Sequence, residues 1–148
     1  MRAVVHLPGE GEQIGLGSSS SVTIKATGKD TEGSFHLSEA VIIPGYAGPP
    51  PRVHDRQHDM FYVLEGTLTL QIGDETVDLG PGSFACIPPG IVHTFSNRGE
   101  QPLRFLNFDT PAGKEDRMRD MAAAAHTAGS LTSEEIARIS SRHDWRVA

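Results

Sequence analysis

Histidine and carboxylate side chains occupy regularly spaced positions in two segments of this sequence. Residues 82–97 fit the pattern G-x5-P-x-G-x2-H-x3-N without a gap, and His93 is the histidine of that pattern. In the upstream segment, His54 is followed after four residues by Asp59, and Gly66 follows after six more. Imidazole and carboxylate groups transfer protons and bind divalent metal ions. The two segments therefore form the candidate site for metal binding or acid–base chemistry.

Strands joined by tight turns are expected to position both segments. Alternating or short apolar runs predict strands at residues 22–26, 36–43, 61–64 and 68–72, the third of them buried on both faces. Turns rich in glycine and proline separate these runs, which is typical of a sandwich or barrel. After one such turn, at residues 88–90, His93 would lie near the mouth of the barrel, where ligand sites of such folds occur. We expect one domain over residues 1–148, with the barrel at about 12–110.

A helical tail is expected after the barrel, at about residues 114–143. Residues 114–128 are rich in alanine and charged side chains, which favour a helix. Thr132 and Glu135 form a capping-box pattern that predicts a second helix through Arg142. We assign both helices to packing and solubility, and the serine run at residues 18–21 to a loop.

Composition and charge exclude several classes of function. The chain has 13 Lys and Arg against 19 Asp and Glu, a net charge of −6, and no long basic cluster, so a nucleic-acid partner is not expected. Its one cysteine, Cys86, cannot form an internal disulfide. The first residues lack the apolar run of a signal peptide, and no stretch has the length of a membrane span. We expect a cytoplasmic protein with a small-molecule substrate and no membrane or nucleic-acid partner.

Both segments resemble the two motifs of the cupin superfamily. The family's first motif is G-x5-H-x-H-x3-4-E-x6-G, and its second is the pattern found at residues 82–97. The likeness extends to residues 22–45, 73–82 and 110–113, which are similar to bacterial one-domain cupins of the quercetin-dioxygenase-like kind. It implies an all-β jelly-roll barrel (double-stranded β-helix) with two short C-terminal α-helices. It also implies a homodimer and one divalent metal ion, Fe(II) first, with Ni(II), Mn(II) or Zn(II) as alternatives.

The first motif departs from the family's ligand set. Counting back from Gly66 places Asp59 at the family's glutamate, His54 at its second histidine and Arg52 at its first. The resemblance then implies that His54, Asp59 and His93 are both metal ligands and catalytic residues. Two histidines and one carboxylate form the facial triad of non-haem Fe(II) oxygenases, which leaves positions open for substrate and O₂.

The sequence leaves two interpretations of Arg52 open. An inward guanidinium would repel a metal and bind a substrate carboxylate or phosphate, whereas an outward one would be a solvated charge. His58 is a substitute ligand only if it swings inward, because adjacent strand residues face opposite ways. Tyr62 and Phe95 are expected to line the substrate pocket or core. Cys86 is expected to be buried, and the histidines outside the motifs are expected to face solvent: His6, His36, His126 and His143.

Three classes of function fit these residues. The first is a metal-dependent dioxygenase, resembling quercetin 2,3-dioxygenase, that acts on an aromatic or enolisable metabolite. The second is a cyclase or isomerase, similar to the cupin polyketide cyclases, in which the metal serves only as a Lewis acid. The third is a metal-free protein that binds a small ligand and has Arg52 in place of the missing histidine.

Overall fold

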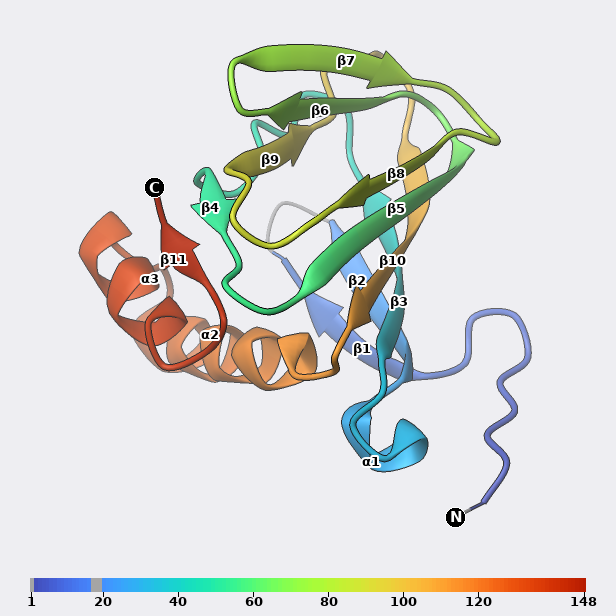
Figure 1. The fold of residues 1–148 in the computed structure, drawn as a ribbon, viewed down its shortest axis with the longest axis vertical. Helices are drawn as coiled ribbons and strands as arrows, with labels where there is room; N and C mark the ends of the chain where they lie inside the picture. The colour runs from blue at the N-terminus through green and yellow to red at the C-terminus, as the bar shows by residue number, and fades with distance from the viewer. Residues whose placement is uncertain (1, 17–19) are drawn as a thin grey trace.

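Two antiparallel β-sheets face each other in the computed structural model, which describes residues 2–16 and 20–148 (Figure 1). The first sheet has the strand order β1-β2-β3-β10-β5-β8, and the second has the order β11-β4-β9-β6-β7. The strand bounds are β1 (Glu12–Gly15), β2 (Ser21–Ala26), β3 (His36–Ile42), β4 (Arg52–Val53), β5 (His58–Glu65), β6 (Leu68–Ile72), β7 (Glu75–Leu79), β8 (Phe84–Ile87), β9 (His93–Ser96), β10 (Leu103–Thr110) and β11 (Arg146–Val147). The expected jelly-roll barrel is confirmed. Of the predicted serine loop, residues 18 and 19 lie outside the described part of the chain, and Ser21 begins β2.

The core lies between the two sheets, and alternation along the strands fills it. Side chains at every second position point inward because the strand repeat is two residues. In β10 the inward positions are Leu103, Phe105, Asn107 and Asp109, all buried. Apolar side chains of both sheets surround the first two, whereas the last two place polar groups at one end of the core.

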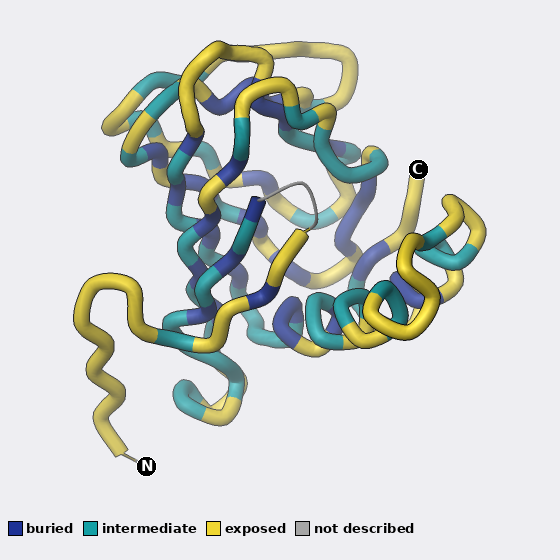
Figure 2. The backbone as a smooth tube through the Cα atoms, turned by 180° about the vertical axis from the view of Figure 1, so that it is seen from behind, coloured by how far each residue is buried: buried dark blue, intermediate teal, exposed yellow. Residues whose placement is uncertain are grey.

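The prediction of a strand buried on both faces at residues 61–64 is wrong. Phe61 and Val63 are buried, but Tyr62 is 44 % exposed, because β5 faces solvent on its outer side. The edge strand β8 likewise leaves Cys86 exposed, which corrects its predicted burial. His36 is also corrected, since it is fully buried at the start of β3. Figure 2 shows buried residues concentrated along the strands, with exposed ones in the loops and tails.

Gly48 and Gly66, on either side of the upstream segment, allow the chain to pass close to neighbouring backbone. Gly66 has a φ of +76°, and a Cβ atom there would collide with the carbonyl of Pro102. Gly48 has a φ of +92°, and its Cβ would collide with the carbonyl of Phe95. Any other residue would be strained at both places, so these glycines fix how the two motif segments approach the barrel strands.

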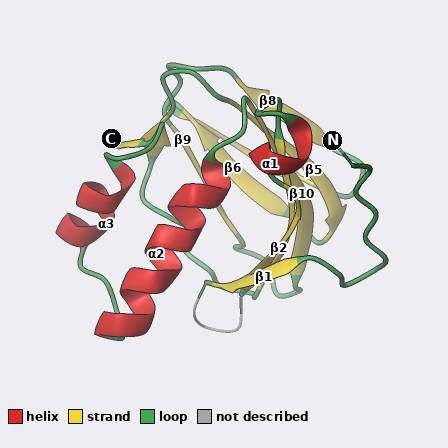
Figure 3. Cartoon of the chain, turned by 90° about the horizontal axis from the view of Figure 1, so that it is seen from below, coloured by secondary structure: helices red, strands yellow, loops and turns green. Residues whose placement is uncertain are grey.

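The C-terminal helices α2 (Lys114–Ala128) and α3 (Ser133–Ser140) lie together beside the barrel (Figure 3). Helix α2 contacts β1 and α3, and α3 contacts β11. The capping box predicted at Thr132 and Glu135 is present, but α3 ends at Ser140, before the expected Arg142. The other helix, α1 (Gly28–Thr31), is a single turn between β2 and β3. Within the described residues, no helix combines the length and hydropathy needed to cross a membrane.

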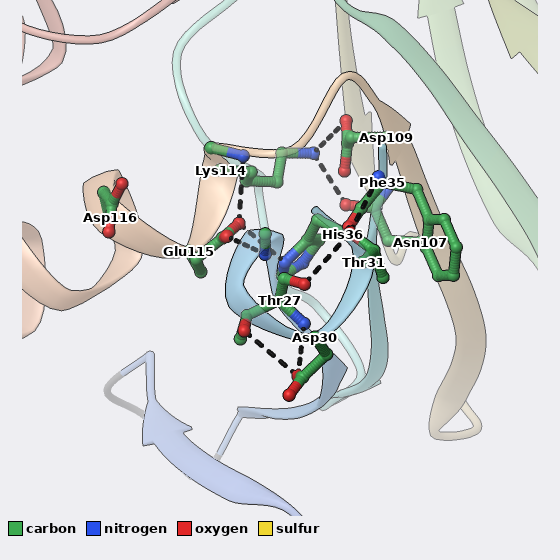
Figure 4. Close-up of polar contacts among 12 residues, drawn as sticks. Thr27, Asp30, Thr31, Phe35, His36, Asn107, Asp109, Lys114, Glu115 and Asp116 are labelled. Atoms are coloured by element: carbon green, nitrogen blue, oxygen red, sulfur yellow. Dashed lines mark hydrogen bonds and ion pairs between the residues drawn. The ribbon is translucent and has the colours of Figure 1, made fainter. Parts of the chain in front are cut away.

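A buried carboxylate fastens the first turn of α2 to the barrel. Glu115 accepts hydrogen bonds from the amides of Gly28 at 2.7 Å and Gly113 at 3.0 Å, and its Oε2 lies 3.2 Å from His36 Nδ1. Figure 4 shows these groups below Lys114. The amide hydrogen bonds and His36 lower the pKa of Glu115 to about 2 against the opposing effect of burial. This contact positions Lys114, the first residue of α2, at the end of β10.

Candidate metal centre

Asp59 is the central residue of the candidate site and is fully buried. Its place in β5 follows from alternation, because Asp59, Phe61 and Val63 share the inward face. Its Oδ2 lies 2.8 Å from His93 Nε2 and 3.4 Å from His54 Nε2, and both histidines are 1 % exposed. The three residues predicted as ligands are therefore brought together, as one group of donor atoms within 4.8 Å of one another.

Backbone carbonyls set the tautomers of both histidines. His54 Nδ1 lies 2.6 Å from the carbonyl oxygen of Asp144, and His93 Nδ1 lies 2.9 Å from that of Ile91. A carbonyl only accepts, so each Nδ1 carries the proton and donates it. In the neutral ring Nε2 then holds a lone pair, and it is the Nε2 atoms that point toward Asp59. This outer arrangement is the one that orients histidines as metal ligands.

Charged and hydrogen-bonding neighbours keep Asp59 ionised between the two histidines. Burial and the nearby Arg52 lower the pKa of His93, against the effect of its contact with Asp59, so the ring is neutral near pH 7. Burial alone would raise the pKa of Asp59, but Lys114, the two histidines and Arg52 together hold it well below its usual range. The ionised Oδ2 thus faces the Nε2 atoms of both histidines, and His54 Nε2 has no hydrogen-bond partner. A carboxylate oxygen and two imidazole nitrogens that converge in this way are donor atoms that a divalent cation can bind.

The two separations from Asp59 Oδ2 are close to those between two ligands of one metal ion. Two atoms each about 2.1 Å from a metal and roughly 90–110° apart around it are separated by about 3.0–3.4 Å. The two measured separations from Asp59 Oδ2, 2.8 and 3.4 Å, are close to that range. His54, Asp59 and His93 therefore suit a divalent metal ion, with further coordination positions left for other ligands.

Arg52 points inward, which decides the question that the sequence left open. It lies on β4, is 1 % exposed, and donates from Nη2 to Asp59 Oδ2 at 3.1 Å. Its guanidinium carbon stands 4.7 Å from the centre of the Trp145 ring. Burial lowers its pKa, whereas Asp59 and Asp109 raise it. The residue that replaces the family's first histidine is thus a buried cation in contact with the same carboxylate oxygen that would bind the metal.

The sequence analysis missed a second polar layer behind Asp59. Asn107 Nδ2 donates to Asp59 Oδ1 at 2.7 Å, and Lys114 Nζ lies 3.2 Å from that oxygen. Lys114 Nζ also lies 3.1 Å from Asp109 Oδ1 (Figure 4). Antiparallel pairing of β5 and β10 sets Asp109 directly opposite Asp59. Burial and the negative charge of Asp59 raise the pKa of Asp109 well above its usual range. The polar residues at inward positions of β10 are the feature of the sequence that could have predicted this layer.

The final residues of the chain complete the wall of the site. Asp144 accepts three backbone hydrogen bonds, from the amides of residues 55, 56 and 57, at 2.7–2.9 Å. Trp145 is buried, and its ring centre lies 5.1 Å from that of His54. The strand β11 then pairs with β4, next to Arg52. This tail, residues 141–148, covers His54 and Arg52, and sequence reasoning assigned it no role.

The remaining predicted residues fall on different surfaces. Phe95 is on the inward face of β9 and lines a cavity of about 490 Å³ beside the centre. Tyr62 lies on the outer face of β5 and is not among the residues that line this cavity. His58 is exposed and faces away from Asp59, its neighbour on β5. The structure therefore groups Phe95 with the site and separates Tyr62 and His58 from it.

Comparisons with known proteins agree with this fold and site. Residues 38–109 match the model of the Cupin domain family. The quercetin 2,3-dioxygenase of Bacillus subtilis is 32 % identical over 92 residues, which are 59 % of this chain but only 25 % of that enzyme. The polyketide cyclase RemF from Streptomyces resistomycificus is 28 % identical with a TM-score of 0.62, covering 74 % of this chain and 80 % of the cyclase. KdgF from Halomonas sp. shares the fold, with a TM-score of 0.67 at 16 % identity over 78 % of this chain and 99 % of KdgF.

The chain belongs to the cupin superfamily. The resemblance drawn from the two motifs is confirmed, and the matched region contains all three residues of the candidate metal-binding group. The chain spans about a quarter of the length of the dioxygenase that it matches.

Proposed function

We propose that this cupin is a metal-dependent enzyme that acts on a small, enolisable molecule, with the metal held by His54, Asp59 and His93. One observation carries the proposal, namely the convergence of two histidine Nε2 atoms and a carboxylate oxygen at one buried point. The Nδ1 contacts with backbone carbonyls orient both rings with Nε2 toward Asp59, as metal-binding histidines are oriented. A divalent ion bound there supplies Lewis-acid polarisation of a substrate oxygen.

The residues around the triad favour a reaction that passes through an anion. Arg52 and Lys114 are buried cations on the two oxygens of Asp59. Two fixed positive charges therefore lie beside the candidate centre in this part of the core. Fixed charges in a water-excluded site stabilise developing charge of the opposite sign more strongly than water does. An enolate formed from a carbonyl substrate beside the centre would gain from this arrangement.

Cyclase or isomerase chemistry is the version that we favour. The two added cations oppose any step that would increase the positive charge of a metal, and so disfavour its oxidation. The similarity to the polyketide cyclase, which covers four fifths of that protein, supports the same choice. A dioxygenase is the second candidate, on the 32 % identity with quercetin 2,3-dioxygenase.

Metal analysis tests the first step of the proposal. The full chain is purified without chelator, and bound metal is measured directly and after incubation with Fe(II), Mn(II), Ni(II) or Zn(II). We expect close to one equivalent for at least one of these ions. Less than about a tenth of an equivalent with all four would refute the metal site and leave the metal-free ligand-binding class.

Two assays then separate the reactions. Loss of the α-proton is followed as deuterium exchange into 1-phenylbutane-1,3-dione by NMR, and O₂ consumption is followed with flavonol and catechol substrates. We expect faster exchange with the metal-loaded protein than with the His93→Ala variant, and no O₂ uptake. Metal-dependent O₂ uptake without exchange would replace the cyclase or isomerase by the dioxygenase. The homodimer and the cytoplasmic location stay predictions, and light scattering would check the first.

A further inference from the structure

A large cavity adjoins the metal centre on the side covered by α2. It has a volume of about 490 Å³, and most of its lining is apolar, including Ile42, Phe105, Met118 and Met121. At roughly 30 Å³ for each water molecule, this volume corresponds to about sixteen waters, which is the size of a ligand with two or three rings. Lys114 belongs both to the lining and to the polar layer behind Asp59.

Arg117 brings an unpaired positive charge to this cavity. It lines the wall from the first turn of α2 and is 9 % exposed. Its Nε donates to Ser140 Oγ at 3.0 Å, and its guanidinium carbon stacks 3.4 Å from the centre of the Trp145 ring. Within residues 2–16 and 20–148, no carboxylate lies within ion-pair distance of it. Burial and the charge of Arg52 lower its pKa to about 9.

Arg119, on the same helix, is paired with a carboxylate as arginines commonly are. Arg119 is partly exposed and forms a two-pronged ion pair with Glu12, with its shortest contact at 2.8 Å. A buried charge, in contrast, is costly unless it is paired and hydrogen-bonded. Stacking on Trp145 lowers that cost for Arg117, but it leaves the charge uncompensated. The missing partner is therefore an anionic group on a molecule in the cavity.

We propose that this cavity binds a ring-bearing organic acid, whose acidic group pairs with Arg117 while its apolar body packs against the barrel wall. This inference names the substrate class and rests on the proposed function only in that the same molecule would reach the metal centre. Guanidinium groups pair with carboxylates through two parallel hydrogen bonds, which adds orientation to affinity. Arg117 would thereby hold the substrate in one direction along the cavity.

Two dyes with the same aromatic body test the proposal. 8-Anilinonaphthalene-1-sulfonate carries an acidic group, and N-phenyl-1-naphthylamine lacks it. Trp145 is the only tryptophan of the chain and lines the cavity, so energy transfer from it reports binding. The assay uses metal-free protein in EDTA, so a failed metal site would not affect it. The variants are Arg117→Gln, Arg117→Lys and, as the matched control, Arg119→Gln, each checked by thermal melting.

We expect the wild-type chain to bind the sulfonate about tenfold or more tightly than the neutral dye, as for a hydrogen-bonded charge pair. Arg117→Gln should abolish that preference and change affinity for the neutral dye less than about twofold. Arg117→Lys should keep part of the preference, and Arg119→Gln all of it. Equal wild-type affinities for the two dyes would overturn the proposal without any variant. A preference that Arg117→Gln leaves intact, or that Arg119→Gln removes, would overturn it as well.

Discussion

Replacing Arg52 by a neutral residue should strengthen metal binding, although Arg52 lies within the site. Its guanidinium donates to the carboxylate oxygen of Asp59 that faces both histidines. A metal on that oxygen would therefore be close to a full positive charge. Arg52→Gln removes the charge and keeps a polar side chain, whereas Arg52→His also restores the histidine of the family motif. The two variants separate the repulsion from the missing ligand.

The size of the effect follows from the geometry. Arg52 Nη2 lies 3.1 Å from Asp59 Oδ2. A metal would lie about 2.1 Å from the same oxygen, so the cation and the metal would be roughly 5 Å apart. A unit charge and a divalent ion at that distance repel by about 1.7 kcal/mol in water and about 6.6 kcal/mol at an effective dielectric of 20. Even the smaller figure exceeds the 1.4 kcal/mol that corresponds to about tenfold in affinity.

Competition with a fluorescent chelator measures the change. Zn(II) and Ni(II) dissociation constants are determined for the wild-type chain and both variants, with circular dichroism as the check on folding. We expect Arg52→Gln to bind about tenfold or more tightly than the wild type, and Arg52→His more tightly still. Unchanged or weaker binding by a folded Arg52→Gln protein would refute the electrostatic reasoning. Arg52 would then support the ligand set by holding Asp59 in place.

Three further predictions concern the ligands, the helix contact and the tail. His54→Ala and His93→Ala should each lower metal affinity by about a hundredfold or more while the barrel stays folded, as judged by metal titration. Glu115, whose folded pKa is about 2 against 4.5 unfolded, should contribute stability above pH 4.5 that is lost as the pH falls toward 2. Glu115→Gln should therefore lower the free energy of unfolding by roughly 2–3 kcal/mol at pH 7 and flatten its pH dependence in this window. Asp144→Ala leaves three amides without their acceptor and should cost about 2–4 kcal/mol in urea unfolding.

The ligand prediction and the Glu115 prediction each have a matched control variant. His58→Ala removes an exposed histidine of β5 and should leave metal affinity unchanged. Asp116→Asn alters an exposed carboxylate next to Glu115 and should leave the loss of stability between pH 4.5 and 2 unchanged. Wild-type metal affinity in the His93→Ala protein would mean that the ligands are wrongly assigned. If Glu115→Gln loses as much stability at low pH as the wild type, the loss comes from other carboxylates.

The motifs predicted the barrel and three of its site residues because strand alternation and turn spacing are local properties. Asp59 and His93 could be paired only through the motif order, since their contact joins two different sheets. The expectation that residues 114–128 form a helix is confirmed, yet its role was misjudged. Lys114, Glu115 and Arg117 have the composition of a solvated helix turn, and nothing local in the sequence shows that all three are buried.

The alternation of residues along β10 also indicates the polar layer behind Asp59. Asn107 and Asp109 continue the inward series begun by Leu103 and Phe105, and buried polar groups at core positions require partners. That rule alone predicts a polar cluster at this end of the barrel. It does not predict the inward direction of Arg52, which depends on the pairing of β4 with β9 and on the packing of Trp145.

Residues 141–148 form part of the wall of the site, whereas the candidate metal ligands come from other parts of the chain. The metal-binding group depends on β5, β9 and the segment before β5, whereas the covering wall comes from a part of the chain outside the family match at residues 38–109. Side-chain substitutions in the tail can therefore change the wall of the site while the backbone carbonyl of Asp144 keeps its contact with His54 Nδ1. Variation of this short segment is the economical starting point for a library that seeks new substrates, and exchanging tails between related cupins would transfer preference as a unit.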